Sequence, residues 1–155
     1  MMNIIEDTKE EIKKLKSFNG NLHLAIFIEP YLSYIISGKK KVESRFSINK
    51  CAPFGKVKKG DIVLIKKSGG PIVGYCKVED VWYYKLDSKS FNDIKDNYSD
   101  LLCVEDSDFW EERKRSSYAT LIRLTNFQQI SPIQVIKKDR RGWVVLKNDN
   151  QKLQL

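Results

Sequence analysis

The side chains best suited to bind or activate a ligand lie together in residues 38–45, GKKKVESR. Arg45 offers a planar guanidinium that can hold a phosphate or a base edge through two parallel hydrogen bonds. Lys40 offers a compact positive charge for phosphate, and Glu43 can accept hydrogen bonds from an exocyclic amine or a ribose hydroxyl. These three residues predict a nucleotide-binding site. The alternative is an internal salt bridge that holds a strand to the preceding helix.

The flanking sequence predicts the elements that position these side chains. Pro30 suits the first position of a helix, where its missing N–H costs nothing. Apolar residues in 31–37 fall on one face at helical spacing, and Gly38 suits the left-handed residue that ends a helix. From residue 42 to 46, apolar or small side chains alternate with charged ones, which predicts a strand.

The pattern G-x-K-x-x-E-x-R resembles the signature of the ASCH domain family, a member of the PUA-like group that also includes the EVE and YTH domains. Further segments agree with that family in the same order along the chain. They are a Gly-Asp turn entering a strand at 59–64, a long fourth strand at 74–81, and a closing segment at 132–133 and 141–146. The resemblance covers about residues 22–147.

The resemblance and the strand patterns together predict an α+β fold. We expect a PUA-like small mixed β-barrel of about five or six strands with peripheral helices, formed by residues 22–147. Strands are expected near 22–28, 42–46, 62–67, 72–84, 116–130 and 142–146. The barrel is expected to carry a helical N-terminal extension (1–21), an acidic helical insertion at about 87–115 and a C-terminal tail (148–155).

Charge is distributed unevenly along the chain. The 155 residues contain 28 Lys and Arg against 20 Asp and Glu, a net charge of +8. Residues 87–112 hold nine acids and two lysines, a net −7, which leaves +15 on the remainder. A strongly basic body predicts one face for a polyanion, with the acidic segment turned away or used for a protein contact. The alternative is that the excess lysine only keeps the protein in solution.

Composition argues against several other classes of protein. No apolar run approaches 18 residues, and the N-terminus lacks a basic stretch followed by an apolar one. We therefore expect no membrane association, no signal peptide and a cytoplasmic location. Three widely spaced cysteines with no C-x-x-C pair predict reduced thiols and no metal site. The sequence also contains no nucleotide-binding fingerprint, and we predict no cofactor.

Two further groups extend the predicted binding surface. Trp82 and Tyr84 are aromatics that can stack on unpaired bases, although strand aromatics are more often core residues. The basic run at 137–141 could follow a phosphate backbone, and the alternative there is a solvated turn. The full predicted nucleic-acid site is Lys40, Lys41, Glu43, Arg45, Trp82, Tyr84, Lys138, Arg140 and Arg141. His23, the only histidine, is expected at a strand start without a catalytic role.

The favoured function is an RNA-binding module that recognises single-stranded or modified RNA, or a nucleotide, through a basic cleft. The alternative is a small nucleic-acid-processing or nucleoside-processing enzyme on the same fold, with Lys40 and Glu43 as its catalytic residues. The resemblance allows a ribonuclease or, less readily, an N4-acylcytidine amidohydrolase. In the amidohydrolases the motif lysine is followed three residues later by a threonine nucleophile, and here that position is Glu43. A third possibility is a protein-interaction module that uses the acidic segment 87–112.

Overall fold

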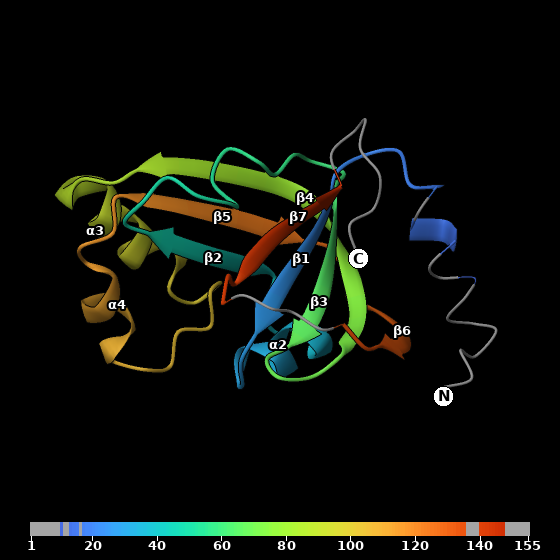
Figure 1. The fold of residues 1–155 in the computed structure, drawn as a ribbon. Coiled ribbons are helices and arrows are strands. Elements are labelled where there is room, and N and C mark those ends of the chain that lie inside the picture. The colour runs from blue at the N-terminus through green and yellow to red at the C-terminus, as the bar shows by residue number, and fades with distance from the viewer. Residues whose placement is uncertain (1–9, 11–12, 16, 136–139, 148–155) are drawn as a thin grey trace.

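The computed structural model describes residues 10, 13–15, 17–135 and 140–147, and a strongly curved seven-stranded sheet dominates them (Figure 1). The strands are β1 (Leu22–Phe27), β2 (Val42–Ser47), β3 (Ile62–Lys67), β4 (Ile72–Lys85), β5 (Tyr118–Leu124), β6 (Gln128–Ile133) and β7 (Trp143–Lys147). The helices are α2 (Tyr31–Ser37), α3 (Ser88–Tyr98) and α4 (Asp108–Arg113). The described residues between 10 and 17 are also helical, and Leu15 there is buried.

The sheet runs in the order β2-β5-β4-β3-β1-β7, and β6 pairs with β4 beside this path. β1 and β3 are parallel, and the other described pairs are antiparallel. The 14-residue β4 carries the curvature, because its first half pairs with β3 and its second half with β5. A register shift between Val78 and Asp80 separates the two halves, as expected of a bulge that bends a strand.

The predicted α+β class is confirmed, but two details of the barrel differ from expectation. The sheet has seven strands instead of five or six, because Thr125 to Phe127 interrupt the single strand expected over 116–130. The sheet also does not close, since β2 and β7 lie at opposite ends of the strand order and are not paired with each other. We call the opening between these two edge strands the seam.

The open edge at β2 places charged side chains and apolar side chains on opposite faces. Val42 and Phe46 pack against the helical insertion, in a cluster with Ile94, Leu102 and Trp110. Arg45 lies on the other face, with its guanidinium carbon 5.1 Å from the Phe27 ring centroid and 5.3 Å from that of Trp143. Val42 and Phe46 therefore lie on one face of β2 and Arg45 on the other, as expected for a strand.

A buried polar cluster ties β1, β3 and β7 together inside the sheet. Oδ2 of Asp61 lies 2.8 Å from Nε2 of His23 and accepts hydrogen bonds from Nδ2 of Asn21 at 3.2 Å and from the backbone N–H of Lys58 at 2.8 Å. Nε1 of Trp143 donates to Nδ1 of His23 at 3.1 Å, which assigns the remaining ring proton to Nε2. We call these residues the Asp61 cluster.

The insertion folds as helices α3 and α4, as predicted. Asp87 caps α3 through a reciprocal pair of hydrogen bonds with Ser90. Figure 1 shows both helices at one end of the molecule, beyond the ends of β2, β4 and β5. No helix in the described part of the chain is long and apolar enough to cross a membrane.

Candidate nucleic-acid interface

A pocket of about 310 Å³ lies beside the seam, and the three residues singled out in the sequence all contribute to it. Its wall joins the edge strand β2 to the end of β1, the start of α2, the end of α4 and the segment before β7. We call it the seam pocket. Its lining residues are Ile26, Phe27, Ile28, Tyr31, Lys40, Glu43, Ser44, Arg45, Phe109, Arg113 and Gly142.

Lys40 is buried and connects the motif to the helical insertion. Its Nζ donates a hydrogen bond of 2.5 Å to the carbonyl oxygen of Leu102 and lies 5.2 Å from the ring centroid of Tyr31. Burial lowers the pKa of the Lys40 ammonium, and the nearby Glu43 carboxylate opposes that shift. Since an ammonium carries three N–H donors, the bond to Leu102 leaves donors for a ligand.

Glu43 satisfies the free edge of β2 and keeps one oxygen for another partner. Its Oε1 accepts a hydrogen bond of 2.8 Å from the backbone N–H of Ser44. Among the described residues, no hydrogen bond to Oε2 occurs. The carboxylate therefore retains an acceptor in a pocket otherwise rich in donors.

Arg45 spans the seam. Its Nη2 donates to the carbonyl oxygen of Ile26 on β1 at 2.9 Å, and its Nη1 donates to that of Gly142 at 3.1 Å. Its Nε is buried and has no hydrogen-bond partner among the described residues, while Oε1 of Glu43 lies 3.9 Å away. The Arg45 side chain thus links β2 to β1 and to the segment before β7, where no backbone hydrogen bonds of the described residues cross the seam. Arg45 also lines the pocket.

The structure adds one cation and three aromatic rings that the sequence interpretation did not include. Arg113, at the end of α4, lies with its guanidinium carbon 3.6 Å from the ring centroid of Phe109 and donates to the carbonyl oxygen of that residue. Phe27, Tyr31 and Phe109 complete the apolar wall. In the sequence, Phe109 and Arg113 belong to the helical pattern of the acidic insertion, and Phe27 and Tyr31 to the apolar stretch 26–31. Neither pattern indicates that these residues share a pocket.

The insertion is held against the motif instead of being turned away from it. In addition to the bond from Lys40, Tyr34 on α2 donates a hydrogen bond of 2.5 Å to Glu105 in the α3–α4 loop. Sγ of Cys103 lies 3.5 Å from the carbonyl oxygen of Lys39. These contacts hold the loop against the motif, and Phe109 and Arg113 of α4 line the seam pocket. The predicted protein contact through 87–112 stays a prediction.

The aromatic residues predicted to stack on bases lie elsewhere. Trp82 and Tyr84 line a different cavity, formed by β4, α3 and Arg123, and the Trp82 ring packs 6.2 Å from that of Tyr98. Lys41 is exposed and does not line the seam pocket. The structure therefore brings Lys40, Glu43 and Arg45 together but does not bring Trp82, Tyr84 or Lys41 to them.

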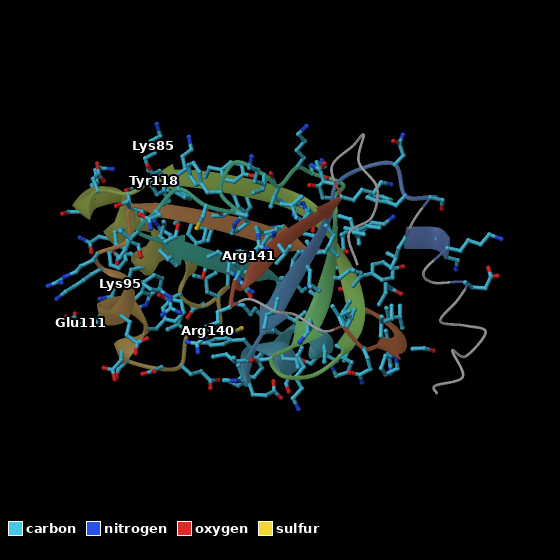
Figure 2. The ribbon with its side chains drawn as sticks, viewed as in Figure 1. Lys85, Lys95, Glu111, Tyr118, Arg140 and Arg141 are labelled. Carbon is cyan, nitrogen blue, oxygen red and sulfur yellow. The ribbon has the colours of Figure 1, made fainter. Side chains whose placement is uncertain are left out.

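Part of the predicted basic run lines a second pocket. Arg140 and Arg141 lie on the segment that leads into β7 (Figure 2). They line a cavity of about 450 Å³ together with Lys66 and the turn after β3. Lys138 lies outside the described residues. We call this second cavity the basic pocket.

Comparison with known proteins identifies the family of this chain. A family model described as the ASCH domain matches residues 26–134. The crystal structure of ASCH from Zymomonas mobilis has a TM-score of 0.63 at 15% identity, covering 81% of this chain and 87% of that chain. A serine-to-alanine mutant of the same protein has a TM-score of 0.65 at 15% identity, covering 84% and 92%. No curated protein matches.

The family match and the structural similarity both agree with the α+β fold of this chain. At 15% identity the structural similarity establishes the fold alone. The family model spans the motif strand, the long β4, the helical insertion and β5 to β6. This chain belongs to the ASCH domain family, as the resemblance of its charged motif predicted.

Proposed function

We propose that this protein binds single-stranded or modified RNA, with a base or nucleoside in the seam pocket. The family is generally associated with nucleic acids, and the excess of basic residues outside 87–112 supports a polyanionic ligand. The observation that carries the proposal is the content of one pocket: three cations, one carboxylate and three aromatic rings.

The chemistry of the pocket suits a nucleotide better than a simple anion. Lys40, Arg45 and Arg113 supply donors for phosphate or for base carbonyls. Glu43 supplies an acceptor for an exocyclic amine, which a site for phosphate alone would not need. Of the three rings, Phe27 and Phe109 are buried, and the half-buried Tyr31 offers a surface for base stacking, which contributes about 1–3 kcal/mol per base. A volume of about 310 Å³ lies at the small end of ligand pockets, as suits one nucleoside.

A titration with a 12-nucleotide single-stranded RNA tests this proposal. We expect affinity to fall steeply as salt rises, because each neutralised phosphate releases counterions. Arg113→Gln should weaken binding several-fold with little loss of stability, since Arg113 is half-buried at the surface. Arg115→Gln is the matched control, because Arg115 is exposed on the same insertion and does not line the seam pocket. Salt-independent binding, or equal effects of the two variants, would contradict the proposal.

The second candidate is a nucleic-acid-processing or nucleoside-processing enzyme, and the lowered pKa of Lys40 favours it. A lysine with a lowered pKa beside a carboxylate has the components for acid–base catalysis. Both groups, however, are partly engaged: Lys40 donates to Leu102, and Glu43 accepts from Ser44. Intact RNA after incubation with the pure protein, observed by mass spectrometry, would support binding over catalysis. Cleavage that is lost in Lys40→Met would make the enzyme the favoured candidate.

A further inference from the structure

We propose that the basic pocket is a phosphodiester subsite that continues the seam pocket, so that the ligand is a strand and not a free nucleoside. This proposal rests on the proposed function and adds a residue, Lys66, that the sequence did not indicate. Among the described residues, the basic pocket is lined by three cations, Lys66, Arg140 and Arg141, and by no acid. The remaining lining residues are Ile26, Ser68, Gly69, Gly70, Gln134, Val135 and Gly142.

Lys66 is unusual because it is a buried lysine without a carboxylate partner. The residue is 5% exposed, and its Nζ donates one hydrogen bond of 3.1 Å to the carbonyl oxygen of Lys67. No carboxylate of the described residues forms an ion pair with it. Buried charges are normally paired, because removal from water disfavours an isolated ion. An anion in this pocket would supply the missing partner.

The two pockets share part of one wall. Ile26 and Gly142 line both of them. Lys66 on β3 is paired in register with Ile26 on β1. The N–H of Ile26 donates to the carbonyl oxygen of Gly142 at 3.0 Å. Gly142 in turn accepts from Arg45 on the far side of the seam. Lys66, Ile26, Gly142 and Arg45 therefore follow one another across the molecule.

Gly142 lies at the boundary between the two pockets. This residue has no side chain, and a Cβ added there would lie 3.0 Å from Nη1 of Arg45. A ligand that passes over Gly142 meets the Arg45 guanidinium there. Neighbouring paired strands are about 4.8 Å apart. Lys66 on β3 and Gly142 beside β7 are separated by two such intervals, about 10 Å, with Ile26 on β1 between them. The geometry fits a base in the seam pocket and a phosphate of the same strand beside Lys66 and Arg140.

A salt-dependent titration of a 12-nucleotide single-stranded RNA with paired lysine variants tests the subsite. Lys66→Met should weaken binding by about tenfold, because a charged contact to phosphate is lost. It should also reduce the slope of log affinity against log salt by about 0.7, the value for one single-strand phosphate contact. Lys67→Met is the matched control, because Lys67 is adjacent, exposed and absent from both pocket linings. That control should leave both quantities near wild type.

A second variant keeps the test valid if Lys66→Met fails to fold. Arg140→Gln removes an exposed cation from the same pocket and should also weaken binding and reduce the slope. If wild-type protein binds RNA while Lys66→Met and Arg140→Gln match it in affinity and slope, the subsite is refuted and the proposed function stands. If the wild-type protein binds no RNA, both the subsite and the proposed function are refuted. If nucleoside monophosphates bind as tightly as the strand, the ligand is a free nucleotide and the strand proposal is overturned.

Discussion

Two polar clusters lie within this small fold, and they differ in how completely their hydrogen bonds are satisfied. In the Asp61 cluster, Oδ2 of Asp61 has three donors nearby and both ring nitrogens of His23 have partners. In the seam pocket, Nε of Arg45 is buried without a hydrogen bond, and Glu43 has one satisfied oxygen. Among the described residues, the Asp61 cluster leaves no buried side-chain nitrogen or oxygen without a hydrogen-bond partner, whereas the seam pocket leaves Nε of Arg45 and so has capacity for a ligand.

This contrast separates the structural charges of this chain from the charges proposed to bind a ligand. A satisfied polar cluster fixes neighbouring strands, and its removal leaves buried groups without partners. An unsatisfied cluster beside a cavity carries a cost that a ligand can offset. The sequence presents both as charged residues on strands, so only their surroundings distinguish them. The predictions below test this distinction, beginning with the largest expected effect.

Loss of Asp61 should destabilise the fold strongly without changing the binding site. Asp61→Ala leaves His23, Asn21 and the Lys58 amide without their shared acceptor, at about 1–3 kcal/mol for each unsatisfied buried group. Denaturant unfolding should therefore show a loss of about 3 kcal/mol or more, while RNA affinity per folded molecule stays constant. Asp61→Asn retains an acceptor oxygen and should lose less. A stable Asp61→Ala protein would show that the Asp61 cluster does not hold the strands together.

Arg45 should show both effects, since it spans the seam and lines the pocket. Arg45→Met removes the donors to the carbonyl oxygens of Ile26 and Gly142, and we expect a loss of about 1–3 kcal/mol in stability. RNA affinity should fall by about tenfold in the same protein. Arg45→Lys should restore little, because an ammonium cannot reproduce the planar donor arrangement.

The combination of melting and binding data decides what Arg45 does. A large loss of stability with unchanged affinity per folded molecule would make Arg45 a purely structural brace. Unchanged stability with weakened binding would make it a ligand contact alone. Either result would remove the dual role that the bonds across the seam suggest.

Lys40 should make RNA binding sensitive to pH below the range in which exposed lysines titrate. Burial lowers its pKa, so the Lys40 ammonium proposed to contact RNA loses its proton before exposed lysines do as pH rises. Affinity for an alkali-resistant 2′-O-methyl RNA should then fall a few-fold between pH 7 and about pH 10, and Lys40→Met should lack this component. The pH dependence of folding stability has the opposite sign to that of RNA affinity. The unfolded chain binds the proton more tightly, so the Lys40 contribution to stability increases as pH rises through its lowered pKa.

N4-acetylcytidine should remain intact in the presence of the protein, which is the smallest effect expected. Glu43 stands where the related amidohydrolases have threonine, and its Oε1 already accepts from the Ser44 amide. Chromatography after prolonged incubation should detect no acetate. Release of acetate that depends on Lys40 would show instead that the incomplete cluster is catalytic.

The sequence predicted the local elements well, because short-range patterns determine them. Gly38 ends α2 with a φ of +80°, and β2 alternates its faces as expected. It predicted less well where strands end, since Thr125, Asn126 and Phe127 between β5 and β6 include no glycine or proline to mark the break. The open seam was not predictable, because closure depends on whether β2 and β7 meet in space, and no local pattern records that.

The family, the α+β class and the three charged residues at one strand edge could be inferred from the sequence, since they follow from spacing along the chain. The other groups of the seam pocket became evident only from the packing of the folded chain. Arg113 and Phe109 belong to an insertion far along the chain, while Trp82 and Tyr84, the aromatic residues proposed from the sequence, line a different cavity. The physical reason is that a pocket is formed by long-range packing. Helix α4 packs against β2, so its residues lie next to a motif more than sixty positions away.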